Sequence, residues 1–231
     1  MCFSASASFV AGVVLTVIGV ASIKRTRHTS QVFFASIPLI FGVQQIAEGI
    51  LWLTLPNPEY VNTQKVFTYI FLLFAEFVWP IWIPIAILLL EKNAKRRNIQ
   101  KILVGAGLIV GIYLAYCLFT FHVEAKIVGH HISYFQNFPK SLRIFGIILY
   151  AMATIVPPLF SKIKRMWILG LTILISYIVT AIFYEHYILS VWCFFSSIIS
   201  LSIYAIILEI SKGQKQQPVF NNRYYRQRLC K

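Results

Sequence analysis

Residues 44–52, with the sequence QQIAEGILW, place a carboxylate inside an apolar segment that runs from 31 to 55 and is long enough to cross a bilayer. A charged side chain within a membrane span costs roughly 2.5 kcal/mol or more, so it usually faces protein or trapped water. Gln44, Glu48 and Trp52 follow one another at four-residue intervals and therefore share one face of a helix. We expect the other apolar segments to form a wall around this face.

The composition indicates an integral membrane protein. Of the 231 residues, 58% are hydrophobic and only 12% are charged, whereas soluble domains carry about 25% charged residues. The formal net charge is +14, a value that in a soluble protein would suggest a nucleic-acid partner. Here the Lys and Arg residues gather between the apolar segments, so we attribute the charge to membrane topology and expect no nucleic-acid partner.

Seven apolar segments have about the 20 residues that a transmembrane helix needs. They comprise residues 5–23, 31–55, 66–90, 102–121, 142–160, 166–184 and 186–210. The connections after the first, third and fifth segments, together with the tail at 212–231, hold most of the Lys and Arg residues. The positive-inside rule then places the N-terminus outside and the C-terminus inside. The sequence therefore predicts an all-α bundle of seven transmembrane helices followed by a basic cytoplasmic tail.

Proline and glycine predict how some of these segments bend and pack. Pro80 and Pro84 each remove a backbone donor from the third segment, so we expect a kink whose freed carbonyl groups need partners or water. Gly107 and Gly111 form a GxxxG pair, and Gly12 and Gly19 in the first segment are also small. Such residues let helices approach closely, within one chain or between two copies in a homo-oligomer.

Most unusual polar residues fall in the outer half of this topology. At a rise of 1.5 Å per residue, Glu48 lies about 10 Å and Glu76 about 15 Å below the outer end of its segment. Neither has a Lys or Arg at a matching depth, so each is protonated, hydrogen-bonded or bound to a cation. The predicted ligand-binding residues are Gln44, Gln45, Glu48, Trp52, Glu76, Trp79, Trp82, His186, Ser190 and Cys193.

The long fourth connection, residues 122–140, carries His130 and His131 and is expected to be a loop over the bundle. Imidazole groups combined with a carboxylate suit zinc or another divalent metal. With His186 and Glu48, the two histidines make a candidate metal site. The alternative is that both are ordinary residues at the membrane interface.

Several short stretches together resemble an uncharacterised family of bacterial multi-pass membrane proteins. They are MCFSASASF at 1–9, QQIAEGILW at 44–52, WPIW at 79–82, GHH at 129–131 and SVWCFF at 190–195. The resemblance covers nearly the whole chain and implies the bacterial inner (plasma) membrane, with membrane lipids as partners and no assigned activity. A looser likeness is to the seven-span superfamily of alkaline ceramidases and adiponectin receptors. That superfamily has a late HxxxH pair and an Asp, where this chain has His186 followed by Ser190 and no Asp.

Three functions remain open on the sequence alone. The leading hypothesis is a receptor or transport-type module whose outward-facing polar pocket binds a small ligand, a proton or a cation through Glu48. It requires a cavity of roughly a few hundred Å³ at Glu48. The second is a membrane-embedded hydrolase of lipid amides or esters, in which a bound metal polarises water. The third is a structural or assembly subunit, in which the buried polar groups are fully packed and hydrogen-bonded.

Overall fold

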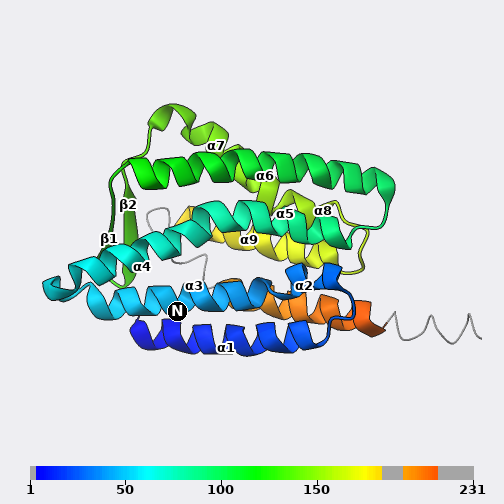
Figure 1. Cartoon of the computed structure of the whole chain (residues 1–231), viewed down its shortest axis with the longest axis horizontal. Coiled ribbons are helices and arrows are strands. Elements are labelled where there is room, and N and C mark those ends of the chain that lie inside the picture. The colour runs from blue at the N-terminus through cyan, green and yellow to red at the C-terminus, as the bar shows by residue number, and fades with distance from the viewer. Residues whose placement is uncertain (1–3, 184–194, 213–231) are drawn as a thin grey trace, which may run out of the picture.

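The computed structural model describes residues 4–183 and 195–212, which are mostly helical. The helices lie side by side with their axes roughly along one direction (Figure 1). Five are long and apolar enough to cross a membrane: Ala5–Lys24, Thr29–Thr54, Pro58–Leu90, Ala94–Thr120 and Phe195–Lys212. The apolar helices Arg143–Leu159 and Met166–Thr180 are shorter. This architecture is that of a helical multi-pass membrane protein.

Helix α1 (Ala5–Lys24) packs closely along α3 (Ile37–Thr54). Ser4 caps α1 because its Oγ accepts a hydrogen bond from the Ala7 backbone nitrogen at 3.3 Å. A Cβ atom at Gly19 would lie 2.6 Å from the Leu39 backbone nitrogen, and one at Gly12 would lie 2.9 Å from a side-chain carbon of α3. The prediction that these two glycines permit close helix packing is therefore confirmed.

The second predicted span is divided into α2 (Thr29–Ala35) and α3 at Ser36. Pro38 lies in the first turn of α3 and has no backbone N–H to continue the helical ladder. The carbonyl group of Phe33 accepts hydrogen bonds from Ser36 Oγ at 3.0 Å and from Trp82 Nε1 at 3.0 Å. The break is thus supported by side chains of two helices.

The third predicted span begins earlier than expected and contains a π-helical turn. It consists of a 3₁₀ turn η1 (Pro58–Tyr60), α4 (Val61–Leu73), the π turn η2 (Phe74–Val78) and α5 (Trp79–Leu90). The backbone N–H of Trp79 donates to the Phe74 carbonyl, five residues back, and Pro80 has no N–H. The Ala75 carbonyl is therefore left without a helical donor, and the Tyr150 hydroxyl donates to it at 2.6 Å. The sequence predicted a kink, and the structure places a π turn directly before Trp79 and Pro80; the expected partner for a freed carbonyl is the Tyr150 hydroxyl.

Helix α6 (Ala94–Thr120) contacts this turn through glycine. A Cβ atom at Gly107 would lie only 1.9 Å from the Pro80 carbonyl oxygen, and one at Gly111 would lie 3.0 Å from the Ile81 side chain. A Cβ atom at Gly105 would meet no neighbouring atom within 4 Å. The GxxxG pair therefore serves helix packing within this chain.

The predicted span 142–160 is interrupted. A 3₁₀ turn η3 (Lys140–Leu142) leads into α7 (Arg143–Thr154), and α8 (Val156–Leu159) follows Ile155. Gln100 of α6 donates to the Pro157 carbonyl at 2.8 Å, which ties this broken segment to the bundle. Helix α9 (Met166–Phe183) then returns along the bundle, and its buried side chains join the main apolar core with those of α5 and the C-terminal helix Phe195–Lys212.

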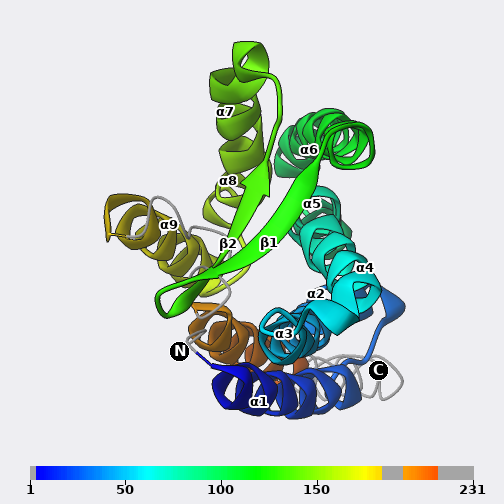
Figure 2. The same ribbon diagram turned by 90° about the vertical axis from the view of Figure 1, so that its left-hand side faces the viewer.

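The fourth connection is a β-hairpin, so the prediction of a loop in an all-α chain is wrong here. Strand β1 (Val123–Val128) pairs antiparallel with β2 (His131–Gln136) around the two-residue turn Gly129–His130. Gly129 has φ +62°, which a two-residue hairpin turn of type II′ requires at its first position. The alternation of apolar Val123 and Ala125 with charged residues was the sequence signal for a strand, and both apolar residues are buried. Figure 2 shows the hairpin lying across one end of the bundle.

Candidate functional site

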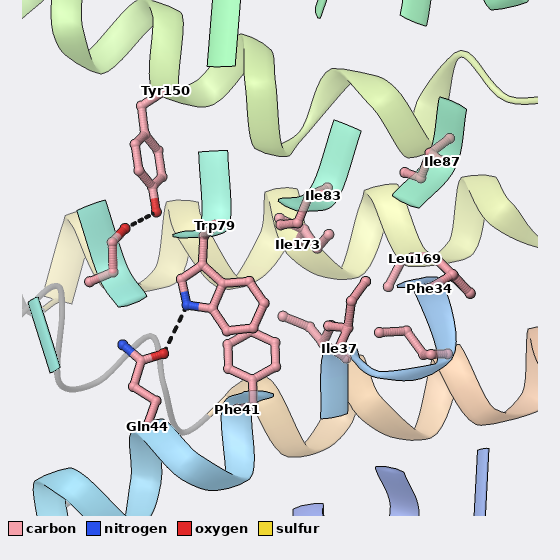
Figure 3. Close-up of a pocket in the computed structure, with 13 residues that line it drawn as sticks. Phe34, Ile37, Phe41, Gln44, Trp79, Ile83, Ile87, Tyr150, Leu169 and Ile173 are labelled. Carbon is pink, nitrogen blue, oxygen red and sulfur yellow. Dashed lines mark hydrogen bonds between the residues drawn. The ribbon is translucent and has the colours of Figure 1, made fainter. Parts of the chain in front are cut away.

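Gln44 joins three helical segments beneath the hairpin. Its Oε1 accepts a hydrogen bond from Trp79 Nε1 at 2.8 Å, and its Nε2 donates to the Phe71 carbonyl at 3.3 Å. Gln44 is 1% exposed, and the Trp79 ring stacks on Phe41 with a centroid distance of 3.9 Å (Figure 3). Because both polar atoms of the Gln44 amide are used, this residue fixes the relative position of α3, α4 and α5.

Glu48 lies one helical turn after Gln44 on the same face of α3. It is fully buried, and its Oε2 accepts a hydrogen bond from Gln45 Nε2 at 3.4 Å. Gln45 is also buried, so the amide and the carboxylate belong to one buried polar group. The structure therefore brings together Gln44, Gln45 and Glu48, as the sequence predicted.

Glu76 is the second buried carboxylate, and the π turn places it beneath the hairpin. It is 5% exposed, and its Oε1 accepts a hydrogen bond from Gln136 Nε2 at the end of β2. Its Oε2 is buried and has no hydrogen-bond partner among residues 4–183 and 195–212. Within the same residues no Lys or Arg forms an ion pair with Glu76. Single π turns inside α-helices are frequent at functional sites.

The hairpin is held over this site by an aromatic stack. Tyr134 of β2 lies parallel to Phe71 of α4, with ring centroids 4.6 Å apart. Since Phe71 also accepts from Gln44 through its carbonyl group, the same residue links the hairpin to the buried polar cluster. Gln136 lies two residues beyond Tyr134 on the same strand face and so reaches Glu76.

A small cavity lies beside the Gln44–Trp79 hydrogen bond. Its volume is ≈ 40 Å³. Gln44 and Tyr150 are the polar side chains of its lining, and Ala75, the chain neighbour of Glu76, is also part of it (Figure 3). Glu48 and Glu76 do not line this cavity, and its volume is well below the roughly 300 Å³ of an organic-ligand pocket.

The remaining predicted ligand-binding residues are distributed over the molecule. Trp52 packs against the apolar cluster that includes the hairpin, whereas Trp82 lies at the α2–α3 break, stacked on Phe33 with a centroid distance of 4.9 Å. The structure therefore does not bring Trp82 to the Gln44 cluster. His186, Ser190 and Cys193 lie outside the described residues.

The candidate metal ligands are not gathered by the part of the chain that the structure describes. His130 is exposed at the hairpin turn, and His131 is half-buried at the start of β2. Burial and the neighbouring His130 lower the pKa of His131. Among the described residues no group of three or more His, Cys, Asp or Glu side chains is placed to hold a metal ion. Because His186 is outside those residues, the zinc site remains a prediction.

Sequence reasoning missed two residues of the site, Gln136 and Tyr150. The alternation of Ile132, Tyr134 and Gln136 on one strand face was a usable signal for Gln136. Tyr150 gave no comparable signal, because its role depends on the Ala75 carbonyl of a distant helix.

The fold defines a helical multi-pass membrane protein with a buried polar cluster beneath a β-hairpin. The chain belongs to the family DUF6629, a family of unknown function whose model matches residues 1–218. This agrees with the resemblance of nearly the whole chain to one uncharacterised family. No curated protein and no solved structure matches the chain. The likeness to alkaline ceramidases and adiponectin receptors gains no support from these comparisons.

Proposed function

We propose that this protein is a transport-type or receptor module of the bacterial inner membrane that binds a proton or a small cation. The binding group is the Glu76 carboxylate, with Glu48 and the Gln44 amide beside it. Seven spans carry the site, with the N-terminus and the hairpin outside and the C-terminus inside. The site then faces the outer side of the membrane.

The distribution of charge supports this orientation. The turn after α1, the connection between α5 and α6 and the connection between α8 and α9 lie at the end of the bundle opposite the hairpin (Figure 1). Together with the first turns of α6, these three connections contain eleven Lys and Arg residues. They lie within residues 24–27, 92–101 and 162–165. The positive-inside rule assigns such an end to the cytoplasm.

The observation that carries the proposal is the buried Oε2 of Glu76, which has no hydrogen-bond partner among the described residues. An isolated ionised carboxylate in an apolar interior is strongly destabilised, so the group must be neutralised or paired. Gln136 satisfies one oxygen, which leaves Oε2 for a proton or a cation. Oxygen ligands of this kind suit protons and hard cations such as sodium or calcium.

The position of Glu48 supports a shared site. Gln44 is four residues before Glu48, and Trp79 is three residues after Glu76, and these two residues are joined by a 2.8 Å hydrogen bond. Each carboxylate is therefore about one helical turn from the same bond. A buried carboxylate that is charged needs a counter-ion, so each of these two groups favours a proton or a cation.

The size of the neighbouring cavity favours a proton or an ion over an organic ligand. The cavity of ≈ 40 Å³ is well below the roughly 300 Å³ of an organic-ligand pocket, whereas a proton or a single ion bound directly by a carboxylate needs no such pocket. Of the small ligand, the proton and the cation that the sequence left open, the proton and the cation are therefore favoured.

Thermal unfolding of the purified protein in detergent tests the proposal. The unfolding midpoint is measured from pH 5 to pH 8 and with sodium, potassium or calcium against choline, for wild type and Glu76→Gln. We expect protonation or one of the cations to stabilise wild type and to have no such effect on Glu76→Gln. The matched control Glu59→Gln, at an exposed site of η1, retains the wild-type response. A wild type without any response, or a Glu76→Gln variant that responds like wild type, contradicts the proposal.

A further inference from the structure

A second and larger cavity lies at the end of the bundle opposite the hairpin. Its volume is ≈ 520 Å³, within the range of small-molecule sites. Four parts of the chain form it: the connection before α2, the end of α5, the connection before α9 and the end of the C-terminal helix, which meet at the right of Figure 1. The lining consists of His28, Ser30, Gln31, Leu89, Leu90, Glu91, Lys92, Asn93, Lys162, Ile163 and Ile210.

The lining of this cavity is amphipathic. Leu89, Leu90, Ile163 and Ile210 supply an apolar wall, and Leu89 is 39% exposed in the last turn of α5. The polar residues belong to the start of α2 and to the connections after α5 and before α9. A ligand that fits both parts has a polar head and an apolar continuation, and it lies at the level where the spans end.

Two lysines give the polar part a positive charge. Lys92 and Lys162 come from different connections, both are exposed, and neither forms an ion pair with a described residue. They are therefore free to contact an anion that enters the cavity.

Glu91, the acidic residue of the lining, already forms hydrogen bonds within the protein. Glu91 is 4% exposed and accepts hydrogen bonds from the Asn93 backbone nitrogen at 3.0 Å, from Ser161 Oγ at 3.1 Å and from the Lys162 backbone nitrogen at 3.2 Å. These bonds hold the two lysine-bearing connections together. They also occupy the carboxylate, which leaves the Lys92 and Lys162 side chains without it as a counter-ion.

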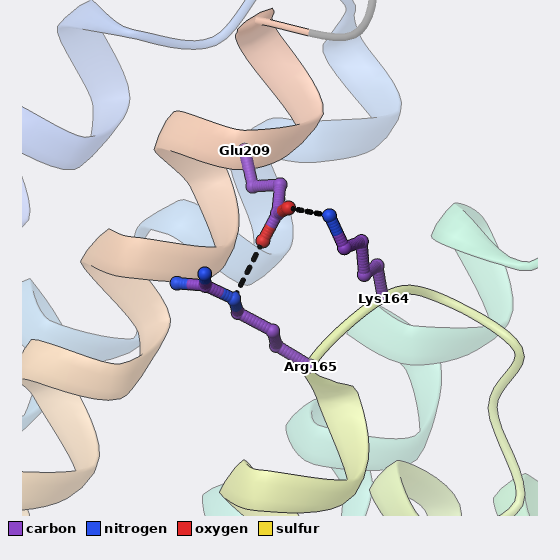
Figure 4. A network of polar contacts seen from close by, with 3 residues as sticks. All are labelled: Lys164, Arg165 and Glu209. Carbon is purple, nitrogen blue, oxygen red and sulfur yellow. Dashed lines mark ion pairs between the residues drawn. The ribbon is translucent and has the colours of Figure 1, made fainter.

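Glu209 is engaged in the same way on the C-terminal helix. It pairs with Lys164 Nζ at 2.5 Å and with Arg165 Nε at 2.9 Å (Figure 4). Glu209 is thus neutralised by cations that do not line the cavity. With Glu91 ionised, Lys92 and Lys162 leave the lining with a net positive charge.

We propose that this cavity binds the headgroup of an anionic phospholipid from the inner leaflet. The phosphate lies between Lys92 and Lys162, and the glycerol and the first chain carbons lie along Leu89, Ile163 and Ile210. Basic pockets between transmembrane helices on the cytoplasmic side are typical sites for anionic lipid headgroups. The apolar wall favours a lipid over a free anion. The inner-leaflet assignment rests on the orientation proposed above, but the cavity is separate from the Glu76 site, so lipid binding here and cation or proton binding there are tested independently.

A lipid titration in neutral detergent tests this inference. The unfolding midpoint and the number of bound lipids, from native mass spectrometry, are measured with dioctanoyl phosphatidylglycerol, dioctanoyl phosphatidylcholine and inorganic phosphate. We expect phosphatidylglycerol alone to stabilise wild type and to bind in a ratio of one lipid to one chain. Because each lysine near a membrane surface contributes about 1 kcal/mol, we expect Lys92→Gln/Lys162→Gln to weaken this binding roughly tenfold or more.

The matched control is Lys95→Gln/Lys101→Gln, which removes the same charge from exposed positions of α6 that do not line the cavity. It should bind phosphatidylglycerol within about twofold of wild type, because it leaves both cavity lysines in place. Equal weakening in the two double variants overturns the inference, since it reveals diffuse attraction. Stabilisation by phosphate alone overturns it in favour of a soluble anion, and equal effects of the two lipids overturn the role of charge.

Discussion

Glu76 and Glu91 lie near the two ends of the same pair of helical segments, α5 and the π turn before it, and both are buried. Glu91, just beyond the span, has a backbone donor for Oε1 and both a side-chain and a backbone donor for Oε2, and these hydrogen bonds join two connections. Glu76, inside the span, has one donor for one oxygen and none for the other among the described residues. A fully satisfied carboxylate stabilises a fold, whereas a half-satisfied one is available to a ligand.

The largest expected difference between the two sites is in stability. Glu91→Gln places an amide NH₂ against the donors of Ser161 and Lys162, so we expect a loss of about 2 kcal/mol in the free energy of unfolding. Glu76→Gln should change stability little at neutral pH, because it removes a carboxylate that lacks full hydrogen bonding. Thermal and denaturant unfolding of both variants measures the contrast, and equal losses would contradict it.

The pH dependence of Glu91 sharpens the same contrast. Burial alone would raise the pKa of Glu91, but hydrogen bonds from Asn93, Lys162, Ser161 and Lys92 lower the pKa below its ordinary value. The ionised Glu91 therefore stabilises the folded state fully above the unfolded pKa of about 4.3, and this stabilisation is lost as the pH falls through the lower folded pKa. The difference between wild type and Glu91→Gln should shrink over that range, and a constant difference would show that the charge of Glu91 is not its cause.

A slightly smaller effect is expected where α6 supports the π turn. Gly107→Ala puts a Cβ atom 1.9 Å from the Pro80 carbonyl oxygen, so the helices must separate at a cost of about 1–3 kcal/mol. Gly105→Ala, two residues earlier on the same helix, meets no neighbouring atom and should be neutral or stabilising by up to about 1 kcal/mol. Unfolding midpoints that fall equally in both variants would exclude the close contact.

The smallest expected effect concerns the carbonyl group that the π turn releases. Tyr150→Phe leaves the Ala75 carbonyl without its donor and should cost about 1–2 kcal/mol. Tyr116→Phe, at an exposed position of α6, serves as the control and should have no effect. In a Pro80→Ala background, which restores a backbone N–H, the cost of Tyr150→Phe should fall, and an unchanged cost would refute the role assigned to Pro80.

Sequence reasoning found the site in part. Gln44, Gln45 and Glu48 could be grouped because helical periodicity is local and the polar residues stand out in an apolar segment. The hairpin was missed because two short strands are marginally stable by themselves, and the stack of Tyr134 on Phe71 that holds them joins distant segments of the chain. Trp82 was predicted to be a wall of the site together with Trp79. The two residues lie about one turn apart along the helix axis, and their rings stack on different partners, Phe33 for Trp82 and Phe41 for Trp79.

The sequence by itself determined the apolar helices, the glycine contacts and the basic end, because hydropathy, side-chain size and charge are properties of local segments. The tertiary structure alone decided that Gln136 reaches Glu76, that Tyr150 donates to Ala75 and that Glu91 joins two connections. Each of these pairs is separated by sixty residues or more, and no local pattern encodes which distant donor reaches which acceptor. The difference between the hydrogen-bonded carboxylate of Glu91 and the half-satisfied carboxylate of Glu76 therefore depends on partners that only folding brings together.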